Sequence, residues 1–502
     1  MENNNNNNTS NNFKEKNFSN DYKLTTSLQS NVDIFKNKIL ANDDSIVYRY
    51  LKNKKTGKQF CIIFVESLIN SREINQNIIE PLIHDPMDKI VESNTFLDYI
   101  SEKVLTTNSI MRTNSIDLAV KSILYGDTLL LIENFDEVIY INTKDWERRS
   151  ISEPDAEGAI KGPREGFAES INTNISLLRR KLNTPDLKFK NRDIGGVIKT
   201  KICLCYLESL VPQKALDDLN SRLDKIKAEG ILGSNYIEES IKDHPNSIFN
   251  TIGGTERPDT VMGKLLEGRI ALICDGTPYV LTMPFIFLEY FQVNEDYYSN
   301  FIYGSINRLL RMFSFFLSTS TPAIYVALTT FHQELIPTPL IISIASAKKE
   351  VPFPTIVEAI LMLIVFELIR ETGTRLPKNI GQAISIVGAL VLGEAAVSAT
   401  LISAPMVIVV ALTAITQFAL PKMSQTIIIL QMSLLLISSF IGLYGYIFGV
   451  IGISIYLFSM KSLGVDYMLK YGSLNKNDLK DVIIRASEEN KNKNNRFIIW
   501  KN

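Results

Sequence analysis

The sequence predicts a fold in two parts: a soluble half of two duplicated α/β modules, followed by an all-α, polytopic transmembrane domain. Three observations support this fold class. Charged residues lie mainly before residue 312 and after residue 460, and a largely apolar stretch separates them. Windows in the soluble half match without a gap at a constant offset of 142 residues. Within each repeat, strand-like runs alternate with helix-like runs, as in α/β layers.

These observations divide the chain into six segments. They are an asparagine-rich, disordered tail (1–21), module 1 (22–142), an inter-repeat insert with an amphipathic helix (143–182), module 2 (183–300), a transmembrane domain of four to six spans (301–461) and a cytoplasmic C-terminal tail (462–502).

The composition indicates which partners the protein does not bind and in which compartment its soluble half lies. The 502 residues carry a net charge of −1, so no attraction to nucleic acid is expected. The tail contains six consecutive asparagines and lacks the apolar core of a signal peptide. All four cysteines lie in apolar, strand-like runs without metal spacing, which predicts reduced core thiols on the cytoplasmic side.

The internal repeat rests on three pairs of windows. Residues 60–68 match 202–210, residues 116–124 match 258–266, and residues 126–133 match 268–275. Each repeat reads as a strand, a polar helical run (71–83 and 213–228), a second helical stretch and a closing strand (128–132 and 270–274). Three windows at one offset favour duplication over chance.

The insert at 143–182 has no counterpart in the other repeat by this comparison. Its glycine-rich turn is no phosphate loop, because no Gly-Lys-Ser/Thr follows and Pro163 lacks an N–H. Apolar residues from Ile171 to Leu182 follow at helical spacing. Its mixed charges predict contacts between protomers or domains, and the candidate contact residues are Arg148, Arg149, Glu153, Asp155, Arg164, Glu165 and Arg179.

The apolar stretch contains several membrane segments. Residues 312–331 and 423–460 carry no charge, and the second segment is long enough for two passes. Residues 354–369, 380–404 and 405–420 are shorter or carry acidic residues, which leaves the number of spans at four to six. Arginine and lysine flank the first entry and the last exit, so both termini are predicted to be cytoplasmic.

Three acidic residues within these segments are candidates for an ion path: Glu358, Glu394 and Glu367. Ionisable residues are costly in hydrocarbon and mark function by default. Glu367 has Arg370 one turn away and has a local ion pair as its alternative. Glu358 and Glu394 have no local partner, and each either faces a pore or bonds a neighbouring helix.

Longer motifs resemble a known family. Ser152–Gly158, Gly162–Phe167, Glu334–Pro339, Val351–Pro354 and Ile380–Leu390 are similar to the A-subunit family of GerA-type spore germination receptors. The resemblance implies a location in the spore inner membrane and partnership with a transporter-like B subunit and a lipoprotein C subunit. It also implies a homo-oligomer, a pentamer, that forms a nutrient-gated ion channel in membrane lipid.

The sequence also bears on two other functional classes, a transporter and an enzyme. A secondary transporter subunit remains the alternative, although the apolar stretch has too few spans for a twelve-helix carrier and shows no inverted repeat. An enzyme is not expected, because His84, His244 and His332 lie outside nucleophile, metal and phosphate motifs. No catalytic residue, cofactor or metal site is therefore predicted.

Overall fold

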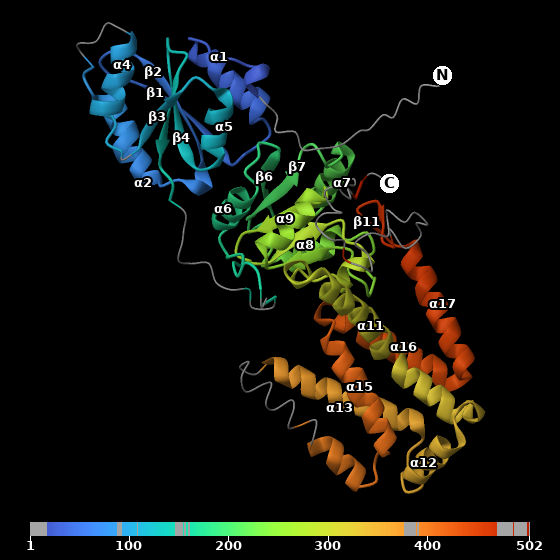
Figure 1. Ribbon diagram of the computed structural model, residues 1–502. Coiled ribbons are helices and arrows are strands. Elements are labelled where there is room, and N and C mark those ends of the chain that lie inside the picture. The colour runs from blue at the N-terminus through green and yellow to red at the C-terminus, as the bar shows by residue number, and fades with distance from the viewer. Residues whose placement is uncertain are drawn as a thin grey trace, which may run out of the picture.

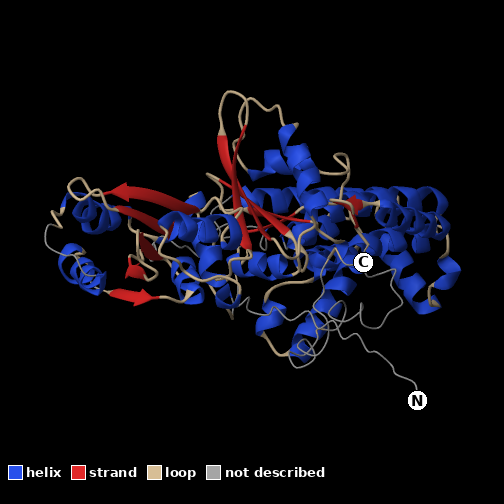
Figure 2. Ribbon diagram, turned by 90° about the horizontal axis from the view of Figure 1, so that it is seen from above, coloured by secondary structure: helices blue, strands red, loops and turns tan. Residues whose placement is uncertain are grey.

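The structure is a computed structural model in which two α/β modules precede a helical part (Figure 1). Module 2 lies between module 1 and the helices, and the two sheets appear as separate groups of strands in Figure 2. The described residues are 18–87, 93–107, 109–145, 154, 157–158, 161–375, 388, 391–468, 485 and 499–500.

Module 1 is built on a five-stranded antiparallel sheet in the order β1-β2-β4-β5-β3. Its interior strand β2 is apolar along nearly its whole length, because helices cover both faces of the sheet. The strands are β1 (Ile46–Lys52), β2 (Gln59–Val65), β3 (Ile110–Thr113), β4 (Asp127–Ile132) and β5 (Val138–Asn142). One face carries α1 (Leu28–Asp33), which continues as a π-helix to Ile39, and α5 (Ile116–Leu124); the other carries α2 (Ser71–Ile74), α3 (Glu80–His84) and α4 (Ser93–Tyr99).

Module 2 has a second five-stranded antiparallel sheet in the order β6-β7-β9-β10-β8. The strands are β6 (Leu187–Ile194), β7 (Thr200–Leu207), β8 (Gly253–Thr255), β9 (Ile270–Cys274) and β10 (Val280–Met283). Helices α6 (Ile171–Lys181) and α9 (Pro258–Leu266) cover one face, and α7 (Gln213–Asp224) and α8 (Ser234–Ile241) cover the other.

The two sheets agree in strand order and in register. Cys61 pairs with Leu131 in module 1, and Cys203 pairs with Ile273 in module 2, so both pairs follow the offset of 142 residues. Helices α5 and α9 begin and end at the same offset. Each is followed by a glycine with positive φ, Gly126 at 99° and Gly268 at 84°, which L side chains rarely adopt.

Two predicted boundaries differ from the elements that the structure describes. The insert does have a counterpart, because α6 occupies the place in module 2 that α1 occupies in module 1. The Asn31 side-chain amide donates to the Thr25 carbonyl, and that of Asn174 donates to the Ala168 carbonyl. These asparagines are 143 residues apart, so a comparison at a fixed offset of 142 missed them. Module 2 therefore begins near Ala168.

The end of the predicted N-terminal tail also differs. Residues 18–20 form a 3-10 turn whose backbone amides at Phe18 and Ser19 donate to Asp117 on α5. The carboxylate at the start of α5 accepts these amides and holds the segment against module 1. The rest of the predicted tail, residues 1–17, lies outside the described residues.

The helical part contains several apolar helices. They are α11 (Phe301–Thr330), α12 (Thr338–Lys348), α13 (Thr355–Arg375), α15 (Ala404–Phe418), α16 (Ser424–Ile441) and α17 (Leu443–Ser459). By length and composition, α11 and the stretch Pro421–Ile441 are long and apolar enough to cross a membrane, and α15 and α17 are shorter apolar helices. In the predicted segment 380–404, residues 380–387, 389 and 390 lie outside the described residues. Of the others, 388 and 391–398 are helical, and Ala404 begins α15.

The apolar block 423–460 divides into two helices at Gly442. This residue has a φ of 70°, and a Cβ there would lie 2.9 Å from the Cβ of Phe331. Glycine is therefore required both by the backbone and by the close approach of the end of α11.

Module 2 and the helices share a packed joint. Phe249, Phe285, Phe287 and Tyr290 of module 2 form one cluster with residues of the α15–α16 turn, α16 and α17. After α17, a short hairpin, β11 (Lys461–Ser462) and β12 (Val465–Asp466), returns to module 2. There the Tyr467 hydroxyl donates to the Asn250 carbonyl over 2.8 Å. The α/β part and the helical part therefore share a continuous core.

Candidate functional site

A small cavity with a mainly apolar lining, which four polar side chains interrupt, lies between α13, α15 and α16. Its volume is about 110 Å³, enough for water. Four of its lining residues are polar: Glu367 on α13, Thr413 and Gln417 one turn apart on α15, and Gln431 on α16. The others are Leu363, Ile364, Phe366, Val410, Ala414, Ile428 and Met432.

The electrostatics of this cavity depend on Glu367 and Gln431. Glu367 forms the predicted ion pair with Arg370, and its side chain keeps 37% of its surface exposed. Gln431 is only 4% exposed, and its Nε2 finds no hydrogen-bond partner within the described part of the chain. A buried amide without a partner is costly unless water or an ion satisfies it. Carboxylate, amide and hydroxyl oxygens together suit a hydrated cation.

Glu358 lies in a different environment from the one its sequence predicted. It is fully buried and accepts hydrogen bonds from the Ser403 backbone N–H (2.9 Å) and hydroxyl (2.6 Å) at the start of α15. The Lys348 Nζ at the end of α12 lies 3.7 Å from its other oxygen. Glu358 therefore follows the alternative given above, a carboxyl group that bonds a neighbouring helix. Glu394, by contrast, is exposed on the helical residues 391–398.

Arg179 ties the two modules together. Its side chain is fully buried and forms an ion pair with Asp43 of module 1. It also donates to the Ser45 hydroxyl (3.1 Å) and the Leu187 carbonyl (3.1 Å), and its guanidinium lies 4.6 Å from the ring centroid of Phe189. Arg179 therefore forms a contact between domains, one of the two alternatives predicted for this segment, and its full burial leaves no surface for a second protomer.

The other candidate contact residues are placed as follows. Arg164 is exposed, and Glu165 pairs with Lys181 on α6 over 2.7 Å. The remaining four, Arg148, Arg149, Glu153 and Asp155, lie outside the described residues.

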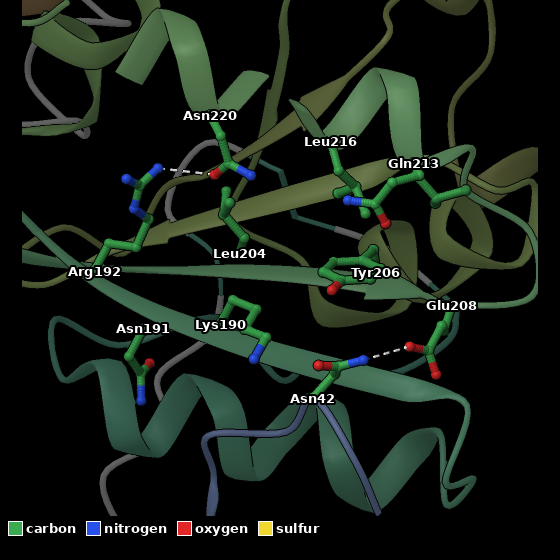
Figure 3. Close-up of a pocket in the computed structure, with 11 residues that line it drawn as sticks. Asn42, Lys190, Asn191, Arg192, Leu204, Tyr206, Glu208, Gln213, Leu216 and Asn220 are labelled. Carbon is green, nitrogen blue, oxygen red and sulfur yellow. Dashed lines mark hydrogen bonds between the residues drawn. The ribbon is translucent and has the colours of Figure 1, made fainter. Parts of the chain in front are cut away.

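A larger cavity, of about 490 Å³, adjoins the junction of the modules (Figure 3). Asn42 of module 1 enters it and donates to Glu208 at the end of β7 over 3.0 Å. Arg192 of β6 donates to Asn220 of α7 over 2.8 Å. The other lining residues are Lys190, Asn191, Leu204, Tyr206, Val211, Gln213 and Leu216. Burial raises the pKa of Tyr206 to about 12, so its hydroxyl stays a neutral donor.

The lining is polar, but its charges are compensated: Lys190 pairs with Asp44, Arg192 pairs with Asp224, and Glu208 adds a carboxylate. This cavity was not predicted from the sequence. Its signal was the alternation of Lys188, Lys190 and Arg192 along one strand, which places their side chains on one face of the sheet. Among the described residues, no group of three His, Cys, Asp or Glu side chains is placed to hold a metal ion.

Comparison with known proteins gives a consistent result. The family model "Bacillus/Clostridium GerA spore germination protein" matches residues 33–497. Spore germination protein KA of Bacillus subtilis is 39% identical over 92% of this chain and 85% of its own length. Spore germination protein B1 of the same species is 34% identical over 92% and 95%, and spore germination protein GerLA of Bacillus cereus is 35% identical over 84% and 86%.

One solved structure is also similar. The N-terminal domain of the A subunit of the Bacillus megaterium spore germinant receptor GerK3 is 30% identical. The match covers 53% of this chain and 98% of that domain, with a TM-score of 0.43.

Proposed function

Because this chain belongs to the GerA family of spore germination proteins, we propose that it is the A subunit of a spore germination receptor and that copies of it assemble into a nutrient-gated ion channel. The observation that supports ion passage best is the cavity between α13, α15 and α16, where Glu367 and two glutamines lie among otherwise apolar residues. Repeated around an oligomer axis, such carboxylates form a ring that favours cations. A secondary transporter subunit remains the alternative.

The proposed assembly contains a homo-oligomer, a pentamer, with a transporter-like B subunit and a lipoprotein C subunit in the spore inner membrane. Support for a common cytoplasmic side of both ends comes from the hairpin after α17, which packs on module 2 through Tyr467. A shared side requires an even number of spans. Arg164 is kept as a candidate contact between protomers because it is exposed.

We also propose that the two modules arose by duplication. The shared strand order, the shared register and the paired asparagines at Asn31 and Asn174 support this origin. The modules contribute different residues to their junction: module 1 supplies Asp43, and module 2 supplies Arg179.

Removing the charge of Glu367 should weaken cation passage. In receptor complexes reconstituted in liposomes, Glu367→Gln is expected to lower nutrient-triggered potassium flux by about tenfold, since a transition-state cost of about 1.4 kcal/mol corresponds to that factor. Glu371→Gln, which removes a carboxylate one turn further along α13, is the matched control and should leave flux unchanged.

Arg370→Gln separates the cavity from the ion pair. It breaks the same pair but keeps the carboxylate, so it should preserve or raise cation flux. Equal fluxes in the parent and Glu367→Gln would contradict a role for this cavity in ion passage.

A further inference from the structure

The loop that follows the first module reaches the helical part. Glu157 of this loop forms an ion pair with Lys422, which lies in the 3-10 turn Pro421–Met423 between α15 and α16. The Glu157 carboxylate also accepts the Thr255 hydroxyl and the backbone N–H of Glu256 (3.2 Å). One carboxylate therefore contacts both module 2 and the turn between two helices.

Residues of module 2 hold Glu157 in place. Arg257, which is 3% exposed, donates to the carbonyls of Glu157 (3.1 Å) and Pro163 (3.0 Å) and pairs with Asp259. Burial raises the pKa of Glu157, but Lys422 and the hydrogen bonds from module 2 outweigh this effect and hold the pKa below its usual value. The Glu157 carboxylate is therefore charged at neutral pH.

The turn that carries Lys422 is equally well held. Leu420 and Met423 flank it and are 2% and 0% exposed against the aromatic residues of module 2. Lys264 of module 2 is itself paired with Glu289 over 2.8 Å. Burial lowers the pKa of Lys264, and the like charge of Lys422 adds to this effect.

The turn that carries Lys422 joins α15 and α16, and both helices line the cavity between α13, α15 and α16. Gln417, near the end of α15, lines the cavity and donates to the Ser424 carbonyl at the start of α16 over 3.2 Å. Gln431 lies two turns further along α16. Because the turn is short and contains Pro421, a displacement of Lys422 moves both glutamines rather than being absorbed by the connection.

We infer that the Glu157–Lys422 pair, beside the apolar joint, is a contact through which a rearrangement of the α/β modules moves the α15–α16 hairpin and changes access to the cavity between α13, α15 and α16. This inference rests on the proposed channel function. It assigns Glu157 and Lys422 as positioning residues, since neither lines the cavity.

A charge exchange in the complete receptor complex tests the inference. Allosteric couplings typically correspond to about 5- to 150-fold. We therefore expect Glu157→Lys or Lys422→Glu to reduce nutrient-triggered potassium flux by about tenfold or more. The double exchange should restore flux to within about threefold of the parent, because it rebuilds the pair. The matched control exchanges Glu238 of α8 and Lys242, which directly follows α8; this ion pair lies within module 2, and its exchange should have little effect.

A cross-link gives a readout that does not depend on flux. Glu157→Cys with Lys422→Cys should form a disulfide in the resting complex, with little competition from the four native cysteines, which are buried. The disulfide is expected to block the nutrient response, and reduction should restore it.

The outcomes separate the two proposals. A parent complex that passes no ions overturns the channel and this inference together. A parent that passes ions, with single exchanges that behave like the parent or a cross-linked form that still responds, overturns this inference alone.

Discussion

Replacing Arg179 with alanine is expected to destabilise the junction of the two modules by about 3–5 kcal/mol, because it leaves the buried carboxylate of Asp43 without its partner. The Ser45 hydroxyl and the Leu187 carbonyl also lose a donor. In the full chain in detergent, this loss should appear as faster hydrogen exchange in β6 and in the loop before β1.

The neighbouring Arg180→Ala is the matched control. Its pair with Glu165 is long, at 3.8 Å, and both side chains are about one-third exposed, so its removal should cost less than about 1 kcal/mol. If both variants exchange at the rate of the parent, the buried pair does not hold the modules together. Conversely, a loss of oligomers in Arg179→Ala at unchanged exchange would restore its role as a contact between protomers.

Replacing Glu358 with alanine should have the second-largest effect. The change leaves the Ser403 N–H and hydroxyl without their acceptor, each at a cost of about 1–3 kcal/mol, and removes the partner of Lys348. The melting temperature of the detergent-solubilised protein is therefore expected to fall by several degrees.

Glu358→Gln tests whether the hydrogen bonds of Glu358, and not its charge, stabilise the protein. Glutamine keeps an oxygen acceptor for Ser403, so most of the stability should return. Glu334→Ala, at a side chain that is 73% exposed, serves as the control and should melt like the parent. A Glu358→Gln protein that melts like the parent but loses cation flux would show that Glu358 acts in the ion path instead.

The sequence predicts the parts of this protein that repeat or that bury apolar surface. The offset of 142 residues predicted which strands are equivalent, and the lengths of the apolar segments predicted that residues 423–460 form two helices. Both signals are local or periodic, so composition and spacing carry them. The family resemblance, which rested on long motifs, is confirmed by the comparisons.

Contacts between distant segments were not predictable in the same way. Arg179 and Asp43 lie 136 residues apart, and no periodicity relates them. The sequence predicted Arg179 at a contact surface and not in the core, because a charged residue at the end of an amphipathic helix is usually solvated. Likewise, Glu358 had no partner nearby in sequence, and Ser403 reaches it only when α13 and α15 pack together. The cavity in Figure 3 also requires residues from both modules.

Current recording on the complete receptor complex in planar bilayers tests the central claim most directly. The purified chain, its B and C subunits and nutrient are combined, and ion current and solute exchange are measured on the same preparation. We expect a nutrient-dependent, cation-selective current without exchange of solute, and a reduced current in Glu367→Gln. A saturable exchange of solute without channel current would contradict channel formation and favour a secondary transporter.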